Sequence, residues 1–410
     1  MTWIPQKDSS LESILIERLK GVASYINSYN FKDDEIGLGS GKAGAALFFF
    51  YYHRYTQEEK YLDKAYTLID EILDFSNITP KTYSLCNGLS GIYWLIHHLY
   101  NNKFISEQPN EIIGDIEDVL FDNATKDFES GFYDYLHGPL GVSLALLENN
   151  SNVTQKHIKL SVEHLDRISK RNSENLVFWT DESPLWYEKP SLLENGKFIN
   201  IHLAHGMASI TMILAKIYSK TGDQLCKKLI ESAEDFILKQ KRDFNKTGSF
   251  FPLAIHALSG PDAHSRLAWC YGDVGIGIGM QQISTILNNN TYKIQASNIL
   301  LTTGQRRDLQ NNGIADAGFC HGTIGLAHIY QRMYSYTMDK KFEEIANFWY
   351  KTTLDFSVTK NGENYFKAID SITEKEDCIS LIDGNIGIGL SLISAVSDID
   401  PKWDSLFLLS

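Results

Sequence analysis

Residues 138–147 read Gly138-Pro139-Leu140-Gly141-Val142-Ser143-Leu144-Ala145-Leu146-Leu147, a Gly-x-x-Gly motif that runs into an apolar segment. The same pattern recurs seven times in the 410 residues, and only the fourth copy lacks the second glycine, having Ser209 there. The first glycines lie 47 to 68 residues apart, at Gly41, Gly88, Gly138, Gly206, Gly272, Gly322 and Gly384. A period of this length is typical of repeated helical hairpins.

The segments after the motifs are apolar on nearly every face, as expected for helices covered by other helices. Between the motifs lie stretches with helical periodicity and one charged face, such as residues 58–76. Similar stretches lie near residues 9–28, 109–122, 153–171, 221–241, 292–304 and 339–356. These inner and outer helices predict an all-α fold, an α/α toroid of about seven hairpins in one domain over residues 1–410. An open array is the alternative, but closure would cover the end repeats.

Long loops precede several motifs, and we expect them to emerge together on one face of the toroid. They span residues 172–204, 242–271, 304–321 and 357–383. We expect a short strand or two around residues 175–201. Binding and catalytic residues usually lie on loops that a rigid scaffold positions.

Composition narrows the classes of partner. The net charge is −13, which gives no general attraction to nucleic acid or to an anionic membrane surface. No run of eighteen apolar residues predicts a transmembrane segment, and the N-terminal residues lack a signal-peptide pattern. The five cysteines are odd in number and form no Cys-x-x-Cys pair, which favours reduced thiols in a cytoplasmic protein.

The loop residues just before each motif carry the chemistry. The residue before the first glycine is polar in every copy: Ser40, Asn87, His137, His205, Tyr271, His321 and Asp383. One position earlier stand three of the five cysteines, Cys86, Cys270 and Cys320. Cys270, Cys320 and His321 come from adjacent repeats, and two thiolates with one imidazole suit one zinc ion with an open fourth position. Buried thiols beside a hydrogen-bonded histidine are the alternative, and this is the reading we expect for Cys86, three hairpins away.

Other ionisable residues cluster in the same loops. Among them are Asp134, His137, His202, His205, Arg266, Tyr271, Asp273 and Asp383. Asp273 and Asp383 stand where a carboxylate could cap an inner helix. We expect His202 to be a packing histidine of the loop.

Three segments carry a family resemblance. Trp269-Cys270-Tyr271-Gly272-Asp273, Gly318-Phe319-Cys320-His321-Gly322 and Leu203-Ala204-His205-Gly206 resemble the lanthionine synthetase C-like family. The resemblance covers essentially the whole chain through the seven motifs. It implies an α/α toroid that holds one zinc ion through Cys270, Cys320 and His321. It also implies proton transfer by His205 and further active-site positions at Asp134, Arg266 and Tyr271. Ser209 and His202 depart from the family pattern.

The resemblance implies a lanthipeptide cyclase. Such an enzyme forms lanthionine and methyllanthionine rings by adding a peptide cysteine thiolate to dehydroalanine or dehydrobutyrine. The implied partners are a dehydrated precursor peptide, a dehydratase and an exporter complex. Two alternatives remain open: a relative that adds glutathione or another thiol to dehydroamino acids, and a non-enzymatic peptide-binding scaffold.

Overall fold

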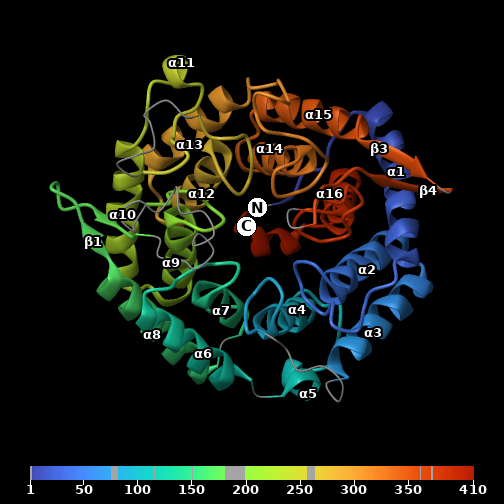
Figure 1. Cartoon of the computed structure of the whole chain (residues 1–410), viewed down its shortest axis with the longest axis horizontal. Helices are drawn as coiled ribbons and strands as arrows, with labels where there is room; N and C mark the ends of the chain where they lie inside the picture. The colour runs from blue at the N-terminus through green and yellow to red at the C-terminus, as the bar shows by residue number, and fades with distance from the viewer. Residues whose placement is uncertain are drawn as a thin grey trace. The chain divides into compact units, whose positions relative to one another are not determined.

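Each of the seven motifs leads directly into a helix in the structure, which is a computed structural model (Figure 1). The structure describes residues 2–74, 82–114, 116–149, 151–180, 199–255, 264–360, 362–370 and 373–410. The chain divides into two compact units. Unit 1 comprises Met1–Thr82, Cys86–Gln108 and Arg307–Ser410, and unit 2 comprises Tyr83–Leu85 and Pro109–Arg306.

The inner helices begin one residue after the first glycine of a motif, so that this glycine is the N-cap residue in all seven. In unit 1 they are α2 (Lys42–Thr56), α4 (Leu89–Asn101), α14 (Thr323–Thr337) and α16 (Asn385–Val396). In unit 2 they are α7 (Pro139–Leu146), α9 (Met207–Thr221) and α12 (Asp273–Ile286). Most of their residues are buried, which confirms the prediction of helices covered on most faces.

The motif needs glycine because the preceding loop folds back against the start of the helix. A Cβ on Gly275 would lie 2.2 Å from the carbonyl oxygen of Trp269, and a Cβ on Gly325 would lie 1.9 Å from that of Phe319. Both distances are too short for any side chain. Backbone hydrogen bonds complete the turn, as from Thr323 N to Asp316 O at 3.2 Å. The motif thereby holds the residues before its first glycine at the N-terminal end of an inner helix.

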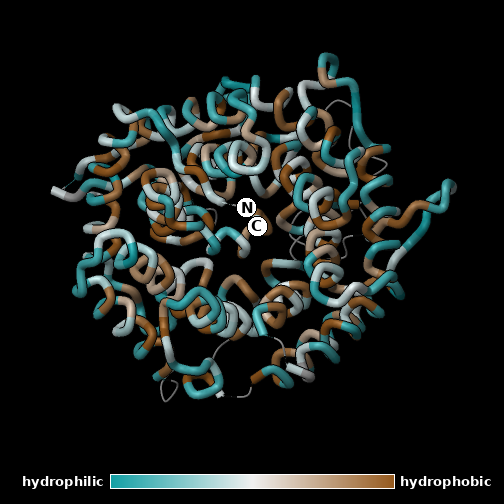
Figure 2. The backbone as a smooth tube through the Cα atoms, turned by 180° about the vertical axis from the view of Figure 1, so that it is seen from behind, coloured by the Kyte–Doolittle hydropathy of each residue, from teal (hydrophilic) through white to brown (hydrophobic). Residues whose placement is uncertain are grey.

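The outer helices are amphipathic, and hydrophilic and hydrophobic residues alternate along them (Figure 2). Unit 1 contains α1 (Ser9–Ser28), α3 (Glu59–Leu73) and α15 (Lys340–Leu354). Unit 2 contains α6 (Glu117–Ser130), α8 (Asn152–Ile168), α10 (Gln224–Lys239) and α13 (Asn290–Thr303), with the short α5 (Pro109–Ile113) and α11 (Phe244–Thr247). The predicted bounds near 109–122 are wrong, because Gly114 has φ +67 after α5 and the longer helix starts only at Glu117.

Inner and outer helices pair in a regular way. An inner helix packs against the outer helix that follows it, as α2 does on α3, α9 on α10, α12 on α13 and α14 on α15. No outer helix follows α16, and α1 from the other end of the chain packs against it (Figure 1). In unit 1 the inner helices are neighbours in the order α14, α16, α2, α4, and in unit 2 in the order α7, α9, α12.

Two short hairpins occur among the described residues. β1 (Lys170–Arg171) pairs with β2 (Val177–Phe178). β2 lies within residues 175–201, for which the sequence predicted a strand or two, whereas β1 precedes that stretch, of which residues 181–198 lie outside the described part. β3 (Ser357–Lys360) pairs antiparallel with β4 (Glu363–Phe366), with Ser357 opposite Phe366. The sequence analysis did not foresee this second hairpin.

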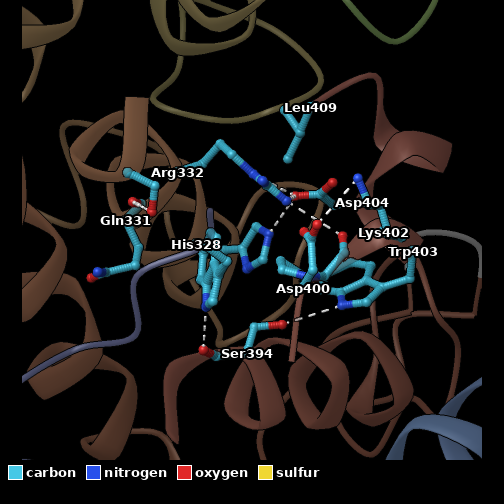
Figure 3. A network of polar contacts seen from close by, with 12 residues as sticks. His328, Gln331, Arg332, Ser394, Asp400, Lys402, Trp403, Asp404 and Leu409 are labelled. Atoms are coloured by element: carbon cyan, nitrogen blue, oxygen red, sulfur yellow. Dashed lines mark hydrogen bonds and ion pairs between the residues drawn. The ribbon is translucent and has the colours of Figure 1, made fainter. Parts of the chain in front are cut away.

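Both ends of the chain are fastened to α14 and α16 in unit 1 (Figure 3). Asp404 lies in the 3₁₀ helix η3 (Lys402–Phe407), and its Oδ2 accepts from Nε of Arg332 at 3.0 Å and contacts Nε2 of His328 at 2.9 Å. The indole of Trp3 stacks on the His328 ring and donates to the carbonyl of Ser394. Within the described part of the chain, no helix combines the length and apolar character that a membrane span requires.

Candidate active site

The sequence-predicted site residues all lie in the turns that lead into inner helices. His137 precedes α7, His205 precedes α9, and Cys270 and Tyr271 precede α12, all in unit 2. Cys320 and His321 precede α14 in unit 1. The N-terminal end of a helix favours negative charge, so these turns suit thiolates and other anionic groups.

Unit 2 brings His205 against Asp134. Nδ1 of His205 lies 2.6 Å from Oδ2 of Asp134, and the carboxylate is buried while the imidazole is partly exposed. Burial alone would raise the pKa of Asp134, but the contact with His205 and the nearby His137 outweigh burial and hold that pKa below its ordinary value. Because Nδ1 faces the carboxylate, Nε2 on the opposite edge of the His205 ring is the nitrogen that faces away from it.

Two other rings flank His205. The His137 ring stacks on it, with centroids 5.9 Å apart and planes 11° apart, and the Tyr271 ring lies 6.2 Å away. The backbone N–H of His137 donates to Oδ1 of Asp134 at 2.7 Å. Asp134 therefore links the His205 ring to the turn before α7, which carries His137. Nδ2 of the buried Asn200 donates to the hydroxyl oxygen of Tyr271 at 3.2 Å.

His202 connects the loop before α12 to the turn that carries Cys270. Its Nδ1 accepts from the backbone N–H of Gly272 at 3.0 Å, and its Nε2 donates to the carbonyls of Pro252 and Leu253. Burial lowers the pKa of His202 to about 4, so the ring is neutral at physiological pH. This confirms the prediction of a packing histidine.

The turn around Cys270 is tight. Gly272 has φ +118, and a Cβ there would lie 2.1 Å from the carbonyl oxygen of Arg266, so only glycine fits. The carbonyl of Cys270 accepts from the backbone N–H of Ala204, which joins the Cys270 turn to the His205 turn within unit 2. Arg266 is partly exposed and belongs to this same turn.

Asp273 does not cap α12 as the sequence suggested. Its carboxylate accepts from the backbone N–H groups of Phe250 and Phe251 at 2.9 and 3.0 Å and from the hydroxyl of Thr303. The side chain therefore anchors the preceding loop to the helix, and burial raises its pKa.

In unit 1, Cys320 and His321 form the turn before α14. The backbone N–H of Cys320 donates to the carbonyl of Ile382 at 2.9 Å, which links this turn to the one before α16. Oδ1 of Asp383 lies 3.7 Å from Nδ1 of His321. Outer carboxylates of this kind commonly orient a metal-binding imidazole.

Cys86 is also in unit 1, in the turn before α4. Its carbonyl accepts from Gly39 N at 2.6 Å, and its Sγ would lie 2.4 Å from a Cβ on that glycine. Since α16 and α2 stand between α14 and α4 in the packing order, Cys86 is separated from Cys320 by two inner helices.

The donor set fits a metal. Among the described residues, Cys270, Cys320 and His321 form a group that can hold a metal ion. Two sulfur ligands and one imidazole are the donors of zinc sites, and three protein ligands leave the fourth tetrahedral position for water or substrate.

A family model described as lanthionine synthetase C-like protein matches residues 32–408. The chain belongs to this family. A similar curated protein is the nisin biosynthesis protein NisC of Lactococcus lactis subsp. lactis, 27% identical over 335 residues, which are 77% of this chain and 78% of NisC.

A solved structure is also similar to this chain. A structure named nisin cyclase matches with a TM-score of 0.78 and 21% identity, covering 97% of this chain and 98% of that one. At this identity the likeness shows the fold, and it confirms the predicted all-α class and α/α toroid.

Sequence reasoning missed Asn200 and the connecting role of His202. Asn200 stands six residues before Gly206, as Arg266 and Asp316 stand six before their own first glycines. A Cβ on Gly206 would lie 2.4 Å from the carbonyl of Asn200, so this position contacts the motif directly. The six-residue spacing is visible in the sequence, but the contact between this position and the first glycine is seen only once the turn is folded.

Proposed function

We propose that this protein is a zinc-dependent lanthipeptide cyclase that forms lanthionine and methyllanthionine rings in a dehydrated precursor peptide. The observation that carries the proposal is the Cys270, Cys320 and His321 donor set in a chain of this family. The hydrogen-bonded His205–Asp134 pair beside the Cys270 turn supports it further. The similarity to NisC supports the class of substrate.

In this proposal Cys270, Cys320 and His321 are the ligands of one zinc ion per chain. When bound there, zinc would lower the pKa of the substrate thiol so that the cysteine reacts as its thiolate. Asp383 would hold the His321 ring by its contact at Nδ1.

The bond changes need no oxidant or reductant. The substrate thiol loses its proton and its sulfur forms a bond to the β-carbon of the dehydroamino acid. The π electron pair of the C=C bond moves toward the amide oxygen as an enolate. The α-carbon then takes a proton, which completes the thioether.

The residues of this chain serve the last two steps. His205 would deliver the proton from Nε2, because its Nδ1 is held by Asp134 at 2.6 Å. Asp134 would orient the ring and stabilise its charged form. Arg266 would stabilise the enolate oxygen, and Tyr271, held by Asn200, would be a second hydrogen-bond donor there.

The remaining expectations belong to the same proposal. We propose that residues 1–410 act as one domain in the cytoplasm, that a dehydratase supplies the peptide and that an exporter complex removes the product. The five cysteines without a Cys-x-x-Cys pair and the dehydroamino acids of the substrate support this placement.

One reaction mixture distinguishes the cyclase from the two alternatives. The enzyme is incubated with a dehydrated Cys-containing peptide and glutathione. A cyclase consumes the peptide thiols without a change of peptide mass. Addition of the glutathione mass would identify the thiol-adding relative, and an unchanged peptide would identify a scaffold; either result contradicts the proposal.

The ligand set is tested with Cys320→Ala. We expect loss of zinc and of cyclisation while the helical content is retained, because the apolar core of α14 does not include the metal. Metal analysis and circular dichroism on the same sample measure both. A full complement of zinc in the variant would refute the assignment.

A further inference from the structure

The carboxylate of Asp134 serves two histidines in different ways. Oδ2 contacts Nδ1 of His205, and Oδ1 accepts the backbone N–H of His137. The carboxylate therefore compensates charge on the His205 ring, whereas the His137 ring receives no hydrogen bond from it. Within the described residues, no hydrogen bond to the ring nitrogens of His137 is found.

The His137 ring is nevertheless held in a fixed place. It lies parallel to the His205 ring at a centroid distance of 5.9 Å, and Gly138 immediately after it starts α7. The ring is partly exposed, so it can reach a molecule that contacts His205. Two parallel imidazoles of different surroundings thus stand at one edge of the site.

The two rings differ in their contact with the Asp134 carboxylate, which touches the ring of His205 but only the backbone of His137. The titratable groups that act on the His137 ring are Asp134 from its own turn and His205 from the turn before α9. Burial lowers the pKa of His137, and the neighbouring His205 lowers it further, while Asp134 opposes both. Burial thus favours the neutral form of the His137 ring, whereas the carboxylate oxygen 2.6 Å from Nδ1 of His205 favours the charged form of the His205 ring. Pairs of titratable groups pushed apart in this way serve as acid and base in enzyme sites.

We propose that His137 is a second catalytic histidine, the base that accepts the proton of the substrate thiol, while His205 is the acid that protonates the α-carbon. This inference rests on the proposed cyclase function. The thiol proton moves to a ring nitrogen of His137, the sulfur bonds to the β-carbon, and the enolate takes its proton from Nε2 of His205. The cycle ends with His137 charged and His205 neutral. One proton passing through water from the first to the second restores both, so no proton is gained or lost.

The test compares His137→Phe with the unchanged protein. Phenylalanine keeps a flat ring against His205 but cannot accept a proton. We expect the cyclisation rate to fall by about 10²–10⁴-fold, with zinc content and peptide affinity unchanged. In the unchanged protein the rate should fall toward acid pH as His137 becomes protonated, and the variant should lack this part of the pH profile. Added imidazole should restore activity to His137→Gly.

A matched control is His164→Phe, on the outer helix α8 of the same unit, which should keep the full rate and pH profile. If His137→Phe does not fold, His137→Gln is measured in its place by the same criteria. An unaltered rate and pH profile in a folded His137 variant would overturn the role of His137 and leave the cyclase proposal standing. Failure of the unchanged protein to cyclise the peptide would instead overturn the cyclase proposal itself.

Discussion

Two histidine–aspartate pairs in this protein have nearly the same contact but different surroundings. His205 and Asp134 meet at 2.6 Å in the turns of unit 2, and His328 and Asp404 meet at 2.9 Å between α14 and η3 in unit 1. The side chain of His205 is 18% exposed, whereas that of His328 is completely buried. In the second pair Arg332 also bonds to the carboxylate. A His–Asp contact is thus a candidate for catalysis only where the imidazole is accessible and the carboxylate has no permanent cation.

Burial alone does not set the charge of these carboxylates. Asp134 and Asp404 are both buried, which by itself would raise the pKa of each, yet their cationic or hydrogen-bonding partners hold each pKa below its ordinary value. Glu234 on α10 is equally buried, and within the described part of the chain its side chain accepts one hydrogen bond, from the hydroxyl of Thr211 at 2.8 Å. Burial raises the pKa of Glu234 to about 7.

The largest effect is expected at His205. His205→Asn should keep zinc and peptide binding but slow ring closure by about 10²–10⁴-fold, because the proton donor is lost. Zinc content, peptide affinity and cyclisation rate are measured on one preparation, with His164→Asn as control. Lost zinc would make His205 a ligand, and an unchanged rate would make it architectural.

Disruption of the buried His328–Asp404 pair should lower the stability of the fold rather than the cyclisation rate. Asp404→Ala leaves Arg332 buried without a counter-charge, and arginine cannot lose its proton. We expect the free energy of unfolding to fall by about 3–5 kcal/mol. Asp134→Ala is the matched change at the other pair, where the partly exposed His205 can be hydrated or deprotonated, and about 1–3 kcal/mol is expected. Equal losses in denaturant titrations would remove the distinction between the two pairs.

Glu234 tests whether partners rather than burial decide the charge. Its unfolded carboxyl ionises near the ordinary value of 4.5 and its folded carboxyl near 7. Between these values the unfolded chain binds fewer protons, so this group makes stability fall as pH rises. The loss of stability attributed to this group amounts to about 3 kcal/mol, and Glu234→Gln should abolish it. Unfolding is followed from pH 4.5 to 8, with the partly exposed Glu231→Gln as control. Identical curves for Glu234→Gln and the unchanged protein would contradict the argument.

The smallest effect is expected at Cys86, which shares its loop position with the proposed ligands. Cys86→Ser should leave zinc content and cyclisation rate unchanged, because two inner helices separate its turn from that of Cys320 in unit 1. Metal analysis checks this directly. A weakened metal site would mean that Cys86 takes part in metal binding, although two inner helices separate its turn from that of Cys320.

Much of the fold and of the candidate site could be predicted from the sequence because one motif repeats. The seven copies of the motif gave the starts of the inner helices correctly, since the loop folds back on its helix and leaves no space for a Cβ at first glycines such as Gly206, Gly272 and Gly322. The positions one and two residues before the first glycine also identified the candidate site residues Cys270, Cys320, His321 and His205. The predicted helix bounds near residues 109–122 were wrong, because Gly114 interrupts the helical pattern there.

Partners within the site depended on the tertiary structure. The sequence placed Asp134 and His205 in the loops before two consecutive motifs, but their 2.6 Å contact, which joins residues 71 apart, came only from the structure. The sequence did not distinguish a role for Asp273 as a loop anchor from a role as a helix cap. The sequence determines local backbone geometry, because steric exclusion at glycine acts within a few residues. The charge and accessibility of an ionisable side chain are decided only when distant turns pack together, because burial and counter-charges come from residues far away in the chain.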